Sequence, residues 1–504
     1  MSRDGARVSQ AALARVEENR PFFDTIQHKA ITPQEFLLLL QKSGVPRGTF
    51  MMRTTAPLHV APAAKALTEM VHTAFYRKLD IGEEELTDDQ RTQLTLSVKK
   101  GGLGLPDFGQ ISPGAWLASQ AASRRLIAAM VPAAELSTDS FLAVSRHACE
   151  SLRATCPGDA KLARFLPDDG NINHLVPAES REDGKVTRLQ QAITSATQLH
   201  TLQGLITRAD NQGKARLLSV SAPGNGYFFN AMPGDVGCAV SASTTCLAAR
   251  FRLGLPPTRV RFRPMVACGL CDRGARADID PWHGLNCPDQ RRKGVLHRHD
   301  SVLQRLDWGA RAIGASTTIE PRINHQNRTK PDMRIQLGNK VLYTDVVITN
   351  PCAPSHVRKA QQQLGASDAA EKRKNDKYAE EAKRIGTQFV AFNLETTGAF
   401  GRGSRTLLKL FQHAYKPEVA TEPWHAIHKQ LTRSIACAVQ IGNANAMERW
   451  LSAANVLEEP NFPAEPHEPA GDDSDFEESE PEDSDGDSES SNKAAEEPAA
   501  EDAA

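Results

Sequence analysis

The sequence has no uninterrupted apolar run long enough to cross a bilayer, and its first residues lack the apolar stretch of a secretory signal. We therefore expect neither a membrane protein nor a secreted one. Nine cysteines among 504 residues are too few for a disulfide scaffold, which favours a reducing compartment. The glycine-rich segment that begins at Lys100 has no following Lys-Ser/Thr and no clear strand before it, so it is not a phosphate loop.

The net charge of −1 hides an uneven distribution along the chain. Residues 471–504 contain fifteen Asp and Glu residues and one Lys, so this segment carries −14 and the other 470 residues carry +13. The Pro-, Glu-, Asp- and Ser-rich sequence from residue 458 onward cannot build a core, and we expect a disordered acidic tail. A basic body favours a polyanion partner, for which the tail could compete; a solvated tail without such a role is an equal alternative.

Two runs of alternating apolar and polar residues flank Gly338-Asn339, a pattern typical of a tight two-residue hairpin. If that dipeptide is the turn, Leu337 pairs with Lys340, and counting outward places Asp332 opposite Asp345. Directly paired residues lie about 4.5–5.5 Å apart, and like charges at that distance repel each other. A divalent cation with oxygen ligands would relieve that repulsion. An edge hairpin whose outer face carries two acids is an equally good interpretation of this segment alone.

The alternation of side chains supports this register. On one face it groups the apolar residues Met333, Ile335, Leu337, Leu342, Val346 and Ile348. A slip of one residue would put the two aspartates on opposite faces. Val341 and Val347 fall on the polar face with the aspartates, so we expect that face to be partly covered, as a cleft is.

A second group of chemically active residues is Cys268-Gly-Leu-Cys271, followed by His283 and Cys287. A CxxC turn brings two thiolates to one ion, and four soft N and S ligands within twenty residues suit tetrahedral zinc. Two unrelated thiols and a core histidine are the structural alternative, and zinc is favoured by the close spacing. His297 and His299 follow as alternative ligands or as part of a helix start.

A charged helix is predicted from Glu371 onward, with Lys374 and Lys377 three residues apart on one face. A strand from Gln388 to Glu395 follows it. With a first helix from His299 to Trp308, the order helix–strand–strand–helix–strand predicts a compact α/β layer in which a lysine of the second helix could reach the aspartates. Without such a layer, the helix is better interpreted as a solvated face.

At this point the chain resembles a known family. Pro331-Asp332, twelve residues and then Asp345 resemble the core motif of the restriction-like endonuclease of non-LTR (LINE-type) retrotransposons, a branch of the PD-(D/E)xK nuclease fold. In that family a CCHC zinc knuckle lies just upstream, as the Cys and His residues do here. The segment Lys99-Lys-Gly-Gly-Leu-Gly-Leu-Pro is similar to the region after the polymerase palm of such proteins. The resemblance covers roughly residues 30–400.

The chain departs from the family in three ways that matter. Eleven residues separate Cys271 from His283, more than a compact knuckle needs, which makes His283 the least secure ligand. The lysine expected two residues after the second acid would fall at Val347, and the family often moves it to the following helix, so that Lys374 and Lys377 are both candidates. No Tyr/Phe-x-Asp-Asp polymerase motif is found, and we expect no polymerase activity from this chain alone.

The resemblance implies a metal-dependent DNA endonuclease whose nick would prime reverse transcription. In it, Asp332 and Asp345 would hold Mg²⁺ or Mn²⁺, and Lys374 or Lys377 would orient water or stabilise the developing charge. Glu395 could add a ligand or a hydrogen bond, although a plain edge acid is the better interpretation. The zinc knuckle would help to grip DNA or the element's RNA. Arg328 and Lys330 could contact phosphates, with solvated loop charges as an equal alternative. No small-molecule cofactor is expected, and a nuclear location follows only from the presumed DNA substrate.

We therefore predict an α+β multidomain protein. Its predicted parts are a helical, thumb-like region (1–135), a helical connecting region (136–260), a CCHC zinc knuckle (261–298), an α/β restriction-endonuclease-like domain (299–400), C-terminal helices (401–457) and the acidic tail (458–504). The main alternative function is a nucleic-acid-binding remnant without catalysis, which the basic body and the knuckle would suffice to support. A scaffold whose acidic tail recruits basic partners such as histones is a third interpretation.

Overall fold

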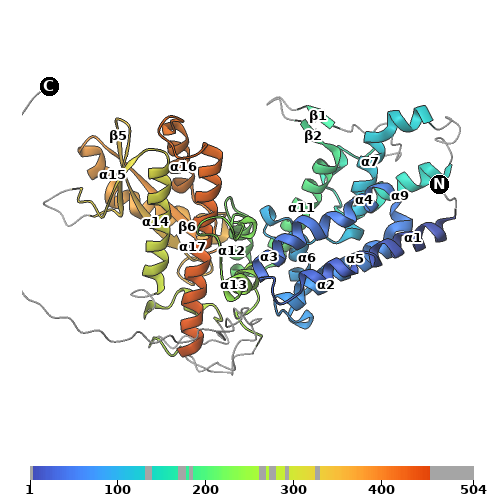
Figure 1. Cartoon of the computed structure of the whole chain (residues 1–504), viewed down its shortest axis with the longest axis horizontal. Helices are drawn as coiled ribbons and strands as arrows, with labels where there is room; N and C mark the ends of the chain where they lie inside the picture. Colours follow the sequence, from blue (N-terminus) through green and yellow to red (C-terminus); the bar gives the residue numbers. More distant parts are fainter. Residues whose placement is uncertain are drawn as a thin grey trace, which may run out of the picture. The chain divides into compact units, whose positions relative to one another are not determined.

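The computed structural model describes residues 4–130, 139–167, 178–180, 186–259, 268–271, 280–289, 294–323 and 330–453. The contacts of the chain divide it into Met1–Glu465 and Pro466–Ala504, and the second unit, with the predicted acidic tail, lies outside the described residues. The described part consists of helices and one four-stranded sheet, with a small separate β-ribbon, which confirms the α+β class (Figure 1). No helix among the described residues is long and apolar enough to cross a membrane.

The N-terminal third is helical, as predicted. Thr32 caps the third helix through a reciprocal pair of hydrogen bonds with Glu35, and Pro33 occupies its first position. A core that includes Phe36, Phe75 and Phe108 joins these helices. Their bounds are α1 Gly5–Glu17, α2 Arg20–Ile26, α3 Pro33–Leu39, α4 Val45–Thr54, α5 Pro57–Lys78, α6 Asp88–Thr95 and α7 Phe108–Met130, with a π-helical turn at Leu40–Gly44.

The region that follows is also mainly helical, although it contains a short antiparallel ribbon that the sequence did not predict. Trp116 of α7 shares a core with Leu152 and Ile193 of two later helices. The elements are α9 Asp139–Thr155, α10 Ala160–Ala163, β1 Ala178–Ser180, β2 Val186–Arg188, α11 Leu189–Arg208, α12 Asn211–Val220 and α13 Ala242–Leu253.

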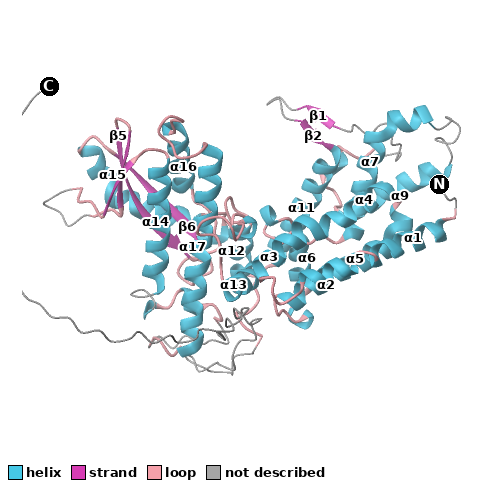
Figure 2. Ribbon diagram, in the orientation of Figure 1, coloured by secondary structure: helices cyan, strands magenta, loops and turns pink. Residues whose placement is uncertain are grey.

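The four-stranded sheet, in which Figure 2 labels β5 and β6, has the order β3-β4-β5-β6. The first three strands are antiparallel, and β5 and β6 are parallel because a helix connects them. The predicted hairpin register is confirmed: Leu337 pairs with Lys340, and Gly338 turns the chain with φ +59°. The bounds are α14 Gly294–Ala312, β3 Ser316–Ile319, β4 Met333–Leu337, β5 Lys340–Thr349, α15 Gly365–Arg384, β6 Gln388–Glu395, α16 Arg402–Ala414 and α17 Trp424–Ala453.

Helices cover both faces of this sheet. One face packs against α14, α16 and α17, and its buried residues include Met333, Ile335 and Val346, the apolar face predicted from the alternation. The other face packs against α15, where Tyr343 contacts the core around Tyr378 and Val341 is partly buried. The expectation that the aspartate-bearing face is partly covered is therefore confirmed, and the cover is α15.

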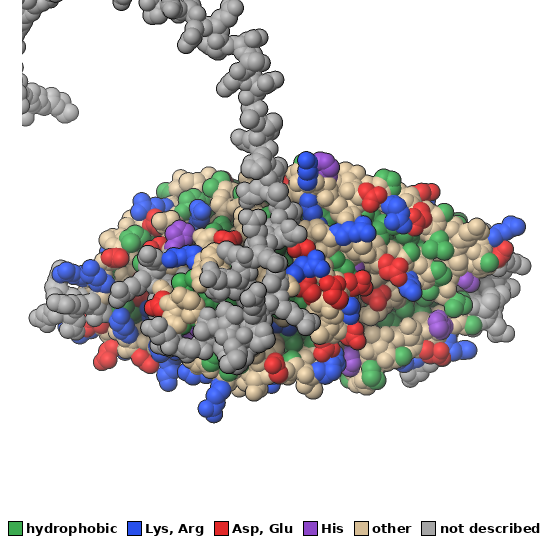
Figure 3. Space-filling model, turned by 90° about the horizontal axis from the view of Figure 1, so that it is seen from below, with side chains coloured by type: hydrophobic (Ala, Val, Ile, Leu, Met, Phe, Trp, Pro, Cys, Tyr) green, Lys and Arg blue, Asp and Glu red, His purple; other side chains and the backbone are tan. Residues whose placement is uncertain are grey.

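The helices α14 and α17 lie side by side (Figure 1). Arg298 of α14 is buried and donates a hydrogen bond of 2.6 Å to Asn443 Oδ1 of α17. On the face drawn in Figure 3, lysine and arginine side chains are interspersed with aspartate and glutamate. The excess of positive charge in the body therefore does not form one broad basic patch on that face.

Candidate metal cluster and carboxylate site

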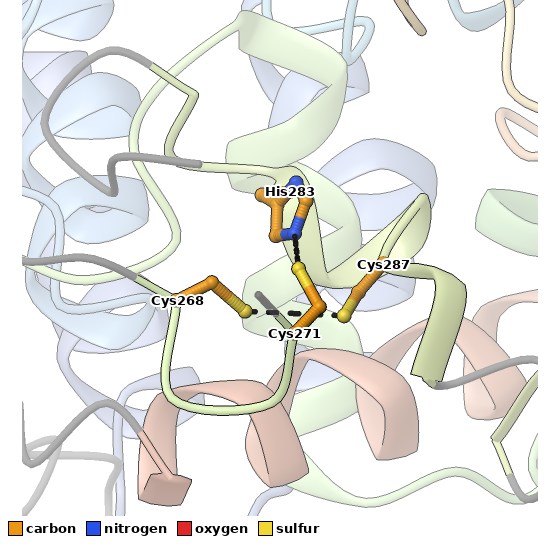
Figure 4. Close-up of side chains that lie close together, drawn as sticks. All are labelled: Cys268, Cys271, His283 and Cys287. Atoms are coloured by element: carbon orange, nitrogen blue, oxygen red, sulfur yellow. Dashed lines mark hydrogen bonds between the residues drawn. The ribbon is translucent and has the colours of Figure 1, made fainter. Parts of the chain in front are cut away.

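The four predicted knuckle ligands, Cys268, Cys271, His283 and Cys287, lie together, and we call them the Cys3His cluster (Figure 4). All four side chains are buried, and their nearest ligand atoms lie within 4.8 Å of one another. Cys268 Sγ is 3.9 Å from Cys287 Sγ, and Cys271 Sγ is 3.4 Å from His283 Nε2. Ligands about 2.0–2.3 Å from one tetrahedral ion are roughly 3.5–3.8 Å apart, so the cluster can hold a metal ion.

The ionisation of the cluster fits a cation. Burial, together with the negative charge of Cys268, raises the pKa of the Cys287 thiol to about 12, because several thiolates close together repel one another. Burial also acts to raise the pKa of Cys268, but hydrogen bonds from the backbone of Leu270 and Cys271 outweigh it and lower that pKa. A bound cation would let all the thiols ionise.

The cluster is part of the packed body. Its cysteines share a core with Phe251 of α13 and with Met447 and Trp450 of α17. A Cβ on Gly284, in the short turn His283–Leu285, would lie 2.9 Å from Met447 Sδ and Trp450 Cβ, so the turn sits directly against α17. The short, polar sequence between the ligand pairs indicates a segment in which metal replaces a missing core. In the structure, however, the cluster has apolar neighbours on two helices, and a bound ion would fasten this segment to them.

The two aspartates are adjacent, as the hairpin register requires. Since Met333 pairs with Thr344, the next position outward places Asp332 opposite Asp345. Asp332 Oδ2 accepts a hydrogen bond of 2.6 Å from the backbone N–H of Val346, which fixes its carboxylate against β5. Asp345 is buried, and burial followed by the negative charge of Asp332 raises its pKa, although Lys374 opposes the shift.

The structure separates the two candidate lysines. Lys374 Nζ lies 2.5 Å from Asp345 Oδ1, whereas Lys377 Nζ donates a hydrogen bond of 2.9 Å to Tyr378 Oη. The Lys374–Asp345 contact is an ion pair between a partly exposed lysine and a buried carboxylate. Of the two lysines, Lys374 is therefore the one placed at the carboxylates.

A histidine also lies at the aspartates. His299 Nε2 donates to Asp332 Oδ2 at 2.9 Å, and its Nδ1 lies 3.0 Å from Asp300 Oδ1. Burial acts to lower the pKa of His299, but the hydrogen bond and charge of Asp332, helped by Asp300, raise it to about 9. The sequence offers His297 and His299 as alternative zinc ligands or as part of a helix start. Both lie in the first part of α14, where His299 contacts Asp332 and His297 is exposed. We call Asp332, Asp345, Lys374 and His299 the carboxylate site.

Other predicted residues fall outside this group or outside the described chain. Glu395 does not join the carboxylates, because the parallel register places Ala391 beside Asp345 and Glu395 four residues further along β6. Its buried carboxylate instead bonds to Ser219 Oγ and to the backbone N–H of Ser367. Lys330 is exposed, while Arg328 lies outside the described residues.

Tyr378 is a contributor that sequence reasoning missed. Its hydroxyl donates a hydrogen bond of 3.1 Å to the carbonyl oxygen of Lys330, two residues before Asp332. Its ring packs on Phe389 of β6, and burial followed by the charge of Asp345 raises its pKa. A spacing of four residues from Lys374 was the signal available in the sequence, since residues i and i+4 share a helix face.

Comparison with known proteins adds no assignment to this geometry: no protein-family model matches the chain, and no curated protein matches it.

Proposed function

We propose that the carboxylate site hydrolyses phosphodiester bonds of DNA with the help of a divalent metal ion. The observation that carries the proposal is the meeting of three charged side chains from two elements: Asp332 and Asp345 on the β4–β5 hairpin, and Lys374 from α15. Two carboxylates on neighbouring inner positions of the sheet and a lysine from the helix that covers them are the set that the resemblance to restriction-like endonucleases requires.

The residues present fit a hard cation. Asp345 is buried, Lys374 Nζ lies 2.5 Å from its Oδ1, and burial followed by the neighbouring carboxylate raises its pKa. An oxygen in this state gains from a cation, and Asp332 supplies a second oxygen ligand. Asp332 and Asp345 would hold Mg²⁺ or Mn²⁺, which when bound would activate the attacking water and offset the charge growing on the phosphate.

The chain's own side chains supply the rest of the proposed chemistry. Water forms a new bond to phosphorus, the bond to the leaving oxygen breaks, and the proton of the water ends on that leaving oxygen. Lys374, whose side chain is 29% exposed, can stabilise a phosphate oxygen while it stays beside Asp345. His299 can take or give a proton at Nε2, and the backbone N–H of Val346 keeps Asp332 in place.

For the Cys3His cluster, we propose structural zinc. All four ligands are protein side chains, three of them thiols, and their ligand atoms lie within 4.8 Å of one another, close enough to converge on one ion. His283 Nδ1 lies 3.8 Å from Asp280 Oδ2, in the place where a zinc-bound histidine usually has a carboxylate partner. In a retrotransposon protein this segment would help to grip nucleic acid in the nucleus, and the nick would prime reverse transcription.

Nicking of supercoiled plasmid by the full chain tests the proposal. We expect open-circular product with Mg²⁺ or Mn²⁺, none with EDTA, and a loss of about 10²-fold or more in Asp345→Asn, which keeps the shape but removes the charge. Gel shifts of the same DNA show whether the variant still binds. Metal-independent nicking, or equal nicking by Asp345→Asn, would refute the assignment.

One observation favours a second function, nucleic-acid binding without hydrolysis. His299 and Lys374 already pair with the two aspartates at 2.9 and 2.5 Å, so the carboxylates have cationic partners within the chain itself. The lysine position within the motif is also occupied by Val347. Salt-sensitive DNA binding together with no metal-dependent nicking is the result that selects this alternative.

A further inference from the structure

A cavity of about 760 Å³ lies in the N-terminal helical part, on elements that share no residue with the carboxylate site. Four cations line it, Arg53, Lys99, Lys100 and Arg188, and no carboxylate of the described chain does. We call it the basic cavity. Four unbalanced positive charges around one hollow repel one another, so the arrangement is stabilised by an anion.

The two lysines are held on a rigid turn. Lys99 and Lys100 end the short helix Val98–Lys100, and Gly101 then reverses the chain with φ +87°. The buried Arg252 donates to the carbonyl oxygens of Val98 and of Gly102 (2.8 Å for the latter).

The two glycines after Lys100 have a structural role at this turn. Gln93 Nε2 donates to Gly101 O at 2.8 Å, and a Cβ on Gly102 would lie 2.1 Å from the carbonyl oxygen of Leu96. The backbone is therefore fastened from its buried side, and the two ammonium groups are presented on the other. The glycine-rich segment that begins at Lys100 is not a phosphate loop of the Lys-Ser/Thr kind. In the structure, it places its lysines at a cavity where an anion can bind.

The first turns of α11 also line the basic cavity. Arg188 precedes this helix and makes no side-chain capping bond, and no acidic residue occupies the first turn. The free N–H groups and the positive end of the helix dipole therefore add to the four side-chain charges. Uncharged hydrogen-bonding side chains continue along the same wall, at Gln190, Gln191, Thr194, Ser195 and Gln198.

The charged lining favours a chain of phosphates as the ligand. The cations come from three separate elements, α4, the Lys99-Lys100 turn and the start of α11. Ala118 and Ala122 of α7 give it small apolar side chains on which a sugar or base can rest. We infer that the basic cavity binds the phosphodiester backbone of a nucleic acid strand, as a second contact besides the carboxylate site. The choice of a nucleic acid over other polyanions rests on the proposed function. The inference that the basic cavity binds an anion does not rest on it.

Binding of fluorescein-labelled single-stranded 20-mers, RNA and DNA of one sequence, to the full chain tests the inference without requiring catalysis. Anisotropy titrations at several salt concentrations, with EDTA present, give the affinity and its salt dependence. Losing two phosphate contacts lowers the salt slope by about 1.4 and, at ~0.1 M salt, the affinity roughly 10- to 30-fold. We expect these changes in Lys99→Gln/Lys100→Gln for at least one of the two strands, and the comparison of RNA with DNA identifies the ligand.

Lys29→Gln/Lys65→Gln is the matched control, since it removes the same charge from exposed positions of the same helical part. It should keep the wild-type slope. Arg53→Gln/Arg188→Gln changes other elements and should lower the affinity and the salt slope in the same way. That result would exclude a local folding defect of the Lys99-Lys100 turn as the cause. Wild-type binding by both cavity variants, or equal losses in the control, would overturn the inference. Failure of plasmid nicking would leave it standing.

Discussion

At the scale of single residues, the carboxylate site depends on which side chains reach the two aspartates. Lys374 and His299 do, at 2.5 and 2.9 Å, although each stands beside a similar residue that does not, Lys377 and His297. The sequence could not separate these pairs. Lys374 and Lys377 share a helix face, and the two histidines are two residues apart, so only the packing of α14 and α15 on the sheet decides between them.

The histidine pair provides a matched test of the site. His299→Ala removes the imidazole from Asp332 and should lower metal-dependent nicking by about 10²-fold, the usual contribution of a positioned acid or base. His297→Ala, an exposed change on the same helix, should nick as the wild type does. Initial rates with supercoiled plasmid measure both. Equal rates for the two variants would exclude His299 from the chemistry.

Glu395 shows how a buried acid couples stability to pH. Burial is the main cause that raises its pKa to about 7, against hydrogen bonds from Ser219 and Ser367. The folded state therefore holds this proton more tightly than the unfolded state. The stability that the protonated Glu395 side chain contributes is fully present below pH ~4.5 and is lost as the pH rises through 7. The free energy of unfolding of Glu395→Gln should match that of the wild type at pH 5 and exceed it at pH 8.5 by on the order of 2 kcal/mol.

Denaturant unfolding at the two pH values measures this difference. A gain that is the same at both pH values would show that Glu395 is not protonated in the folded protein near neutrality. The sequence could not reveal this role, because the serine that contacts the carboxylate lies 176 residues away along the chain.

At the scale of elements, the β4–β5 hairpin was predictable in detail. Period-two alternation and the Gly-Asn turn fix its register locally, and the structure has that register and that apolar face. The neighbouring strand β3, Ser316–Ile319, was missed because four half-polar residues carry no clear alternation. Its pairing with β4 comes from the tertiary fold.

The hairpin turn requires glycine at residue 338. Gly338 has φ +59°, and a Cβ added there would meet no atom within 4 Å, so a side chain would be strained by the backbone alone. Gly338→Ala should lower the free energy of unfolding by about 1 kcal/mol. Gly234→Ala, which also has open space but an ordinary φ, should cost nothing or stabilise slightly. Denaturant midpoints compare the two, and equal midpoints would contradict the turn.

At the scale of the whole molecule, the Cys3His cluster joins a short segment to α13 and α17. The four cluster residues were predictable from their spacing in the sequence. Their packing against α13, which precedes them, and against α17, the last helix of the described chain, was not predictable. Trp450 reaches the cluster because α17 returns along α14, and Phe251 reaches it from α13.

Loss of the ion should therefore be felt beyond the cluster. Cys271→Ser should lose about one zinc ion per chain and lower the melting temperature by roughly 5 °C or more, because the ion stabilises the packed segment. Cys352→Ser changes a cysteine of the same exposure, 8%, outside the cluster, and should keep its zinc. Elemental analysis of the purified variants with thermal melting measures both effects. Equal zinc contents would contradict a zinc site at these residues.

The central claim is that the aspartate pair and the lysine of α15 form a hydrolytic site, and nicking rates of Lys374→Ala beside Lys377→Ala test it most directly. Lys374 is partly exposed, so its loss should disturb the fold less than a change at the buried Asp345. The account predicts a fall of about 10²-fold or more in metal-dependent nicking for Lys374→Ala and less than about fivefold for Lys377→Ala. Equal rates in both variants, or no metal-dependent nicking by the wild type, would contradict it.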